Sequence, residues 1–76
     1  MAYWINQAGN SNRANWRSFY ADTDGDIANL PTSSQEGVKQ EVDPVAHKRC
    51  SIGSECMSLG SSKVYVLGSD NTWKEI

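Results

Sequence analysis

The clearest structural signal in this chain is the run KVYVL at Lys63–Leu67, built largely from the β-branched and aromatic residues that strands favour. Segments with the composition of tight turns flank it, GSS at 60–62 and GSDN at 68–71. Further apolar runs lie beyond these turns, at 55–59 and 72–75, so the sequence predicts an antiparallel β-meander of three strands. Side chains alternate between the two sides of a strand, and both sides of this one are apolar. We therefore expect both faces to be covered, with a neighbouring subunit as one candidate cover.

A further strand and a short helical turn are predicted upstream of the meander. Residues 16–21 (WRSFYA) are rich in aromatic residues, which predicts a strand. Thr23 or Asp24 can then cap a turn or two of helix, which Pro31 ends because the residue before a proline disfavours helical geometry. Residues 32–49 are polar, and a helical turn, an exposed strand or a loop fits them equally well. The predicted fold class is mainly β: a small antiparallel β-meander or sandwich-like module with a short helical turn.

The N-terminal segment differs in composition from the rest of the chain. Tyr3, Trp4 and Ile5 are apolar, whereas the residues that follow are mostly Asn, Gln, Gly and Ser, which favour turns and cannot build a core. We therefore expect an extended N-terminal arm over residues 1–15 and a β-rich domain over residues 16–76. Apolar residues beyond a polar arm should dock on a neighbour more readily than on their own small core. Tyr3, Trp4 and Ile5 are thus the predicted partner-binding residues.

The length of the chain limits its stability as an isolated domain. Its 76 residues form one domain at most, and a domain this small buries only about 60% of the surface of its unfolded chain. Such domains usually need a disulfide, a metal or a partner subunit. The N-terminus has the features of no signal peptide, so we expect synthesis in a cytoplasm, where disulfides are rare. Two cysteines, Cys50 and Cys56, are also too few for a disulfide framework.

Two groups of residues resemble metal ligands. The acidic triplet at 22–26 (DTDGD) has its glycine before the third acidic position, and the next acidic residue is Glu36, so the register of a calcium-binding EF-hand loop is wrong. His47, Cys50 and Cys56 supply three zinc ligands without a fourth Cys or His to complete a structural site. We therefore expect no metal and no cofactor, which leaves a partner as the source of additional stability.

Composition and motifs also argue against several classes of function. The net charge of −2 and the pI of about 5.1 do not favour nucleic acid, and no run approaches the roughly 20 apolar residues of a membrane helix. The sequence contains no nucleophile elbow, no Walker loop and no Gly-x-Gly-x-x-Gly motif. A pair of His47 with either cysteine would lack an orienting third group. The prediction is a protein that is not an enzyme and has no catalytic residue.

Two tryptophans are candidates for contact with a ligand, because exposed aromatic rings can stack on glycans or bases. Trp73 lies in a predicted strand and is expected to belong to the core. Trp4 has polar neighbours that cannot bury it, so it is the better candidate for contact with a partner.

The chain resembles short structural proteins of tailed bacteriophages over about half of its length. One stretch that carries the resemblance is YADT at 20–23, continued by DIANLPT at 26–32. The other begins with GSECMSL at 53–59 and continues with KVYVL at 63–67 and WKEI at 73–76. The resemblance implies a virion component associated with the head, without enzymatic activity and without a cofactor.

These observations lead to one functional expectation and two alternatives. We expect a non-enzymatic virion structural protein, a capsid decoration or fibre-anchoring subunit that is assembled in the host cytoplasm. Its expected partners are the major capsid protein or other virion proteins and further copies of itself, with no nucleic acid and no membrane. One alternative is a peripheral tail or baseplate protein that binds host glycans through Trp4 or Trp73. The other is a small cytoplasmic regulator that binds a protein.

Overall fold

The computed structural model describes residues 2–8 and 15–76. Its regular structure is mainly β, as predicted, with one short 3-10 helix. The elements in chain order are β1 (Tyr3–Ala8), β2 (Arg17–Ala21), η1 (Asp24–Asn29), β3 (Glu55–Ser58), β4 (Lys63–Leu67) and β5 (Trp73–Glu75).

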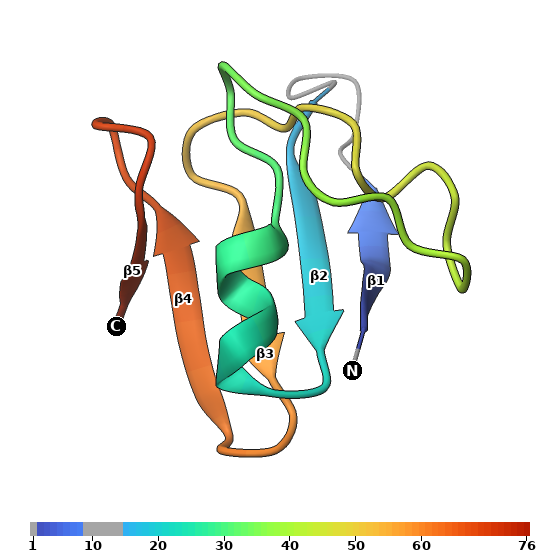
Figure 1. The fold of residues 1–76 in the computed structure, drawn as a ribbon. Coiled ribbons are helices and arrows are strands. Elements are labelled where there is room, and N and C mark those ends of the chain that lie inside the picture. Colours follow the sequence, from blue (N-terminus) through green and yellow to red (C-terminus); the bar gives the residue numbers. More distant parts are fainter. Residues whose placement is uncertain (1, 9–14) are drawn as a thin grey trace.

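All five strands belong to one sheet, in the order β1-β2-β3-β4-β5 (Figure 1). Neighbouring strands are antiparallel except β2 and β3, which are parallel. A parallel pair needs a long crossover connection, and the segment 22–54 supplies it. The chain leaves the end of β2, passes through η1 in front of the sheet, and returns to start β3 (Figure 1).

The predicted C-terminal meander is confirmed. Strands β3, β4 and β5 pair antiparallel in succession, within a residue of the predicted bounds. Ser62 and Asn71 lie in the two connecting turns with φ of 59° and 63°, the left-handed region that short turns use. The sheet as a whole is mixed rather than antiparallel, because β2 and β3 pair in parallel. The sequence pattern did not reveal this pairing.

The predicted extended arm over residues 1–15 is wrong for Tyr3–Ala8, which form β1 in the same sheet as the rest of the domain. Tyr3 is fully buried, and its hydroxyl donates a hydrogen bond of 2.6 Å to the Val38 carbonyl. Tyr3 and Ile5 both face the core, as alternate residues of a strand do. Pairing with β2 supplies hydrogen-bond partners for the backbone of β1. The polar composition of the N-terminal segment had suggested that it would stay apart from the domain. The rest of the predicted arm, residues 9–14, lies outside the described residues.

Local capping explains why η1 begins where it does. The Asp26 carboxylate accepts hydrogen bonds from the Thr23 backbone N–H at 3.1 Å and from its hydroxyl at 3.2 Å. Both acidic residues of the first turn, Asp24 and Asp26, also suit the positive end of a helix. Of the two predicted capping residues, Thr23 and Asp24, the structure uses Thr23, and the turn ends before Pro31 as expected.

The polar segment 32–49 is an irregular loop, one of the three possibilities that the sequence left open. It is anchored close to η1: Gly37 N–H donates to the His47 carbonyl at 2.8 Å, and Val38 N–H donates to the Asn29 carbonyl at 2.9 Å. At Gly37 a Cβ atom would overlap the backbone of residues 29–31. Only glycine allows the loop to lie this close to the end of η1.

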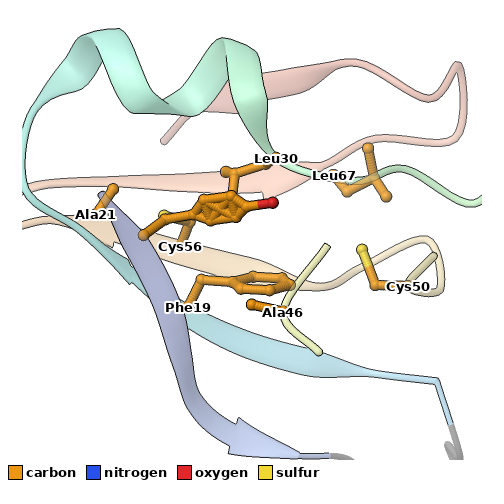
Figure 2. Close-up of a cluster of buried hydrophobic side chains, with 8 residues drawn as sticks. Phe19, Ala21, Leu30, Ala46, Cys50, Cys56 and Leu67 are labelled. Carbon is orange, nitrogen blue, oxygen red and sulfur yellow. The ribbon is translucent and has the colours of Figure 1, made fainter. Parts of the chain in front are cut away.

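The hydrophobic core lies between one face of the sheet and the covering layer formed by η1 and the loop (Figure 2). Aromatic rings pack edge to face within it: Tyr3 on Phe19 with centroids 6.1 Å apart, and Phe19 on Trp73 at 6.0 Å. The residues buried in this core come from strands and loop alike: Tyr3, Phe19, Ala21, Leu30, Ala46, Cys50, Cys56 and Leu67.

Candidate docking surface

The two faces of the sheet differ in how they are covered. Residues on one face of β2 and β3, such as Phe19 and Cys56, are fully buried beneath η1 and the loop. The alternate residues point to the opposite face, where Glu55 and Met57 of β3 are exposed. Within residues 2–8 and 15–76, no helix lies over that face. We call it the open face.

A row of apolar side chains crosses the open face from strand to strand. Trp4 of β1 lies opposite Tyr20 of β2, Tyr20 opposite Met57 of β3, and Met57 opposite Val64 of β4. Ile76, whose backbone N–H donates to the Val64 carbonyl at 2.9 Å, continues the row beyond β5. The Trp4 and Tyr20 rings pack edge to face with centroids 6.2 Å apart. We call Trp4, Tyr20, Met57 and Val64 the aromatic row.

The aromatic row is only partly shielded from solvent. Met57 is 40% exposed, and the other three side chains are half-buried by their neighbours within the sheet. The next row along the strands is more polar, with Ser18, Glu55, Val66 and Lys74 in register. An apolar stripe bordered by polar residues is typical of surfaces that bind another protein.

The edges of the sheet, in contrast, are poorly suited to pairing with another chain. The outward N–H of Ile5 in β1 donates to the Asp43 carboxylate of the loop at 2.9 Å, so that edge group is already engaged. Strand β5 has three residues with Lys74 at its centre. Short edge strands and edge lysines both discourage strand addition. The open face is therefore the more suitable surface for a contact.

Of the three predicted partner-binding residues, the structure places one on the open face. Tyr3 has no exposed surface, and Ile5 packs against the core. Trp4 alone presents its ring to the open face, beside Tyr20. Binding by Trp4 stays a prediction, whereas Tyr3 cannot reach a partner in this fold. Trp73 is packed on Phe19, as expected for a core residue, and its indole N–H donates to the Pro31 carbonyl at 3.0 Å.

The groups considered as metal ligands are directed to separate partners. Asp24 accepts a hydrogen bond of 2.6 Å from the Ser61 hydroxyl, which holds the pKa of its carboxyl below the usual value, whereas Asp26 bonds Thr23. His47 lies 3.9 Å from the Glu36 carboxylate. Among the described residues, no three His, Cys, Asp or Glu side chains gather in a way that could hold a metal ion.

The cysteines are unsuited to nucleophilic chemistry. Both are free, buried thiols. Burial raises the pKa of the Cys56 thiol to about 12 and also raises the pKa of Cys50. Because the thiolate is the reactive form, a thiol with a raised pKa is inert at neutral pH. These residues act as small core hydrophobes.

A shallow hollow lies on the loop beside β1, lined by Lys39, Gln40, Glu41 and Pro44. Three of the four lining residues are exposed. The hollow is thus open to solvent and offers no enclosed pocket for a small ligand.

Comparison with protein-family models, with curated proteins and with solved structures finds no match. The resemblance to phage structural proteins therefore stays a prediction. No helix in the described part of the chain is long and apolar enough to span a membrane.

Sequence reasoning did not identify Tyr20, Met57 and Val64 as one surface. The aromatic residues of 16–21 indicated a strand, along which Tyr20 and the buried Phe19 lie on opposite faces, and the two apolar sides of Lys63–Leu67 indicated a second face to be covered. Those signals lie on different strands, however. Only the strand order places them in register with Trp4.

Proposed function

We propose that this protein is a non-enzymatic structural subunit that docks onto another protein of an assembly through its open face. The observation that carries the proposal is the uncovered aromatic row, Trp4, Tyr20, Met57 and Val64. The sheet and its covering layer already form a two-layer domain, in which the uncovered face of a sheet normally carries polar residues. Apolar side chains on that face therefore favour a cover supplied by another molecule. Aromatic residues and Met are also the residue types enriched at protein interfaces.

The assembly that we propose is the particle of a tailed bacteriophage, as a capsid decoration or fibre-anchoring subunit. The support for this choice is the resemblance of residues 20–32 and 53–76 to phage structural proteins. The neighbour is then the major capsid protein, another virion protein or a further copy of this chain. The inert thiols and the open hollow on the loop agree with a structural rather than a catalytic role.

Binding of host glycans is a second candidate function, and it would fall to the open face as well. Trp73 is engaged in the core, so only Trp4 and Tyr20 present aromatic rings that a sugar could stack on. Glycan binding needs polar groups placed around such rings. The rings share their row with the apolar Met57 and Val64, and the polar Ser18 and Glu55 belong to the next row. The row therefore favours a protein partner.

The test compares incorporation of two matched variants into phage particles. Met57→Lys places a charge in the aromatic row, and Val45→Lys places the same charge on a loop residue that is 55% exposed. Particles made with each variant are purified, heads and tails are separated, and the protein is quantified by peptide mapping. We expect Met57→Lys to be lost and Val45→Lys to be retained at the wild-type level. Absence of the wild-type protein from both fractions would defeat the virion assignment.

Circular dichroism melts of the two isolated variants provide the control for folding. A loss of Met57→Lys counts only if the variant melts cooperatively and near the wild-type temperature. Equal incorporation of both variants would show that the open face is not the docking surface.

A further inference from the structure

We propose that the open face is covered by a second copy of this chain, in a dimer whose two-fold axis runs parallel to the strands and between β2 and β3. The inference deepens the proposed function, because it names what covers the aromatic row. It rests on four features of the described residues: the sizes of the side chains, the position of the charges, the state of the sheet edges and the area of the face.

The side chains of the aromatic row are graded in size in a way that suits this axis. The two largest, Trp4 and Tyr20, come from β1 and β2, and the two smaller ones, Met57 and Val64, come from β3 and β4. An axis between β2 and β3 passes through the centre of this row. It sets Trp4 opposite Val64 of the second copy and Tyr20 opposite Met57 of the second copy. Each large side chain then meets a smaller one, and the gap between the sheets is even.

A two-fold axis perpendicular to the strands does not give this match. It would set each strand over its own copy, so Trp4 would meet Trp4 and Val64 would meet Val64. The sheets would then be held apart at one side and leave a void at the other, which well-packed interfaces avoid. The parallel axis also lets the two sheets pack in the aligned manner typical of β-sandwiches.

The charges of the open face agree with the same axis. Glu55 of β3 lies in register with Ser18 of β2, so the axis places Glu55 opposite Ser18 of the second copy, a hydrogen-bonding partner rather than a like charge. Lys74 belongs to β5, outside the four strands that overlap. No pair of like charges from this polar row is brought together.

The edges of the sheet leave the face as the available surface for self-association. The loop engages the Ile5 N–H of β1 through Asp43. If two β5 strands paired antiparallel about their central residue, Lys74 would lie opposite Lys74, which is destabilising. Association of this chain with itself therefore favours stacking over extension of the sheet.

The area of the face sets the expected strength of the dimer. Four strands about 4.8 Å apart and about five residues long present roughly 300 Å² of flat surface per copy, or roughly 600 Å² for both. Stable complexes bury about 1,200–2,000 Å² of accessible surface, so a face of this size gives a contact at the weak, transient end of the range. Such a contact forms in a dense assembly and dissociates on dilution.

The experiment measures the dimer and then exchanges the sizes of two side chains across it. Sedimentation velocity of the wild type between about 1 and 500 µM should show a monomer–dimer equilibrium. Trp4→Val leaves a gap and Val64→Trp sets two Trp rings together, so each should raise the Kd about tenfold or more. The double variant Trp4→Val/Val64→Trp restores a large residue opposite a small one and should return the Kd to within about threefold of the wild type.

The double variant isolates the contact between copies, because Trp4 and Val64 lie on strands separated by two others within one chain. A wild type that stays monomeric to 500 µM would overturn the proposal. A double variant whose increase in Kd is the combined increase of the two single variants would overturn it as well. Amide NMR spectra at increasing concentration give a second measurement without any substitution: signals of Tyr20, Met57 and Val64 should shift, whereas those of Val38 and Val45 should not. Shifts confined to the loop would also overturn the proposal.

The outcomes separate this inference from the proposed function. A dimer in solution that is absent from purified particles would support the two-fold contact and defeat the virion assignment. A chain that is monomeric at every concentration and yet present in particles would overturn the dimer and keep the proposed function.

Discussion

Replacing Tyr3 by alanine is expected to unfold the domain. The side chain is fully buried, packs edge to face on Phe19, and hydrogen-bonds the Val38 carbonyl of the covering loop. Tyr3 thus joins β1, the centre of the core and the loop. Removing a buried aromatic side chain from a core costs about 3–5 kcal/mol. A core of this size supplies roughly 3–5 kcal/mol of net stability, so Tyr3→Ala leaves almost none.

Tyr3→Phe separates the hydrogen bond from the packing. It keeps the ring and removes one hydrogen bond, worth about 1 kcal/mol. In a domain of this size that loss lowers the Tm by about 4–8 °C. Trp4→Ala is the matched control, because Trp4 is next to Tyr3 in β1 but lies on the open face. Its edge-to-face contact with Tyr20 contributes about 0.5–1.5 kcal/mol beyond the buried area.

The assay is a circular dichroism melt with urea unfolding at low protein concentration, where the monomer predominates. The expected order of stability is wild type, then Tyr3→Phe and Trp4→Ala, with Tyr3→Ala unfolded at room temperature. A cooperative melt of Tyr3→Ala within a few degrees of the wild type would refute the placement of β1 in the sheet. It would restore the extended arm that the composition of this segment suggested.

Four further results are expected. Gly37→Ala should destabilise the fold by several kcal/mol in urea unfolding, because the new Cβ overlaps the backbone of residues 29–31, whereas Gly25→Ala, whose Cβ would lie 3.6 Å from its nearest neighbour, should be tolerated. Ser62→Gly should raise the Tm, since glycine adopts the φ of 59° at this position without strain, and a decrease would contradict that reasoning. The free energy of unfolding should keep its full value below about pH 9 and fall as the pH rises to about 12, because burial raises the pKa of Cys56 and of Tyr3 to about 12. The unfolded chain loses these protons at a lower pH than the folded chain. An unchanged free energy of unfolding up to about pH 12 would rule this out. The Tm should not change with EDTA or with a reducing agent, and a large drop with either reagent would point to a metal or a disulfide.

The elements that depend on neighbouring residues could be predicted from the sequence. The strand Lys63–Leu67, its two turns and the short helix all follow from local composition, turn residues and a cap. The core position of Trp73 also followed from its place in a strand next to a turn. In each of these cases the residues that determine the structure lie within a few positions of one another.

The position of β1 could not be predicted in the same way. Its strand pattern is only six residues long and ends in Asn, Gln and Ala, so composition alone suggested an arm. What orders it is distant in sequence: pairing with Arg17–Ala21, the Val38 carbonyl and the Asp43 carboxylate. The parallel pairing of β2 and β3 is likewise set by tertiary contacts. The aromatic row depends on both of these features, which is why single-strand patterns could indicate its members without assembling them.

The parallel pair at the centre of the sheet also has a consequence for how the chain acquires its structure. Strands β1 and β2 are close in sequence, and so are β3, β4 and β5, so each group can pair early. Joining the two groups requires closure of the segment 22–54, whose entropy must be lost before the central pair can form. Domains dominated by such non-local contacts fold in milliseconds to seconds, slowly for their size. Because the core that holds Tyr3 also contains Leu67 and has Trp73 packed against it, a nascent chain should complete this core only after residue 73 has left the ribosome.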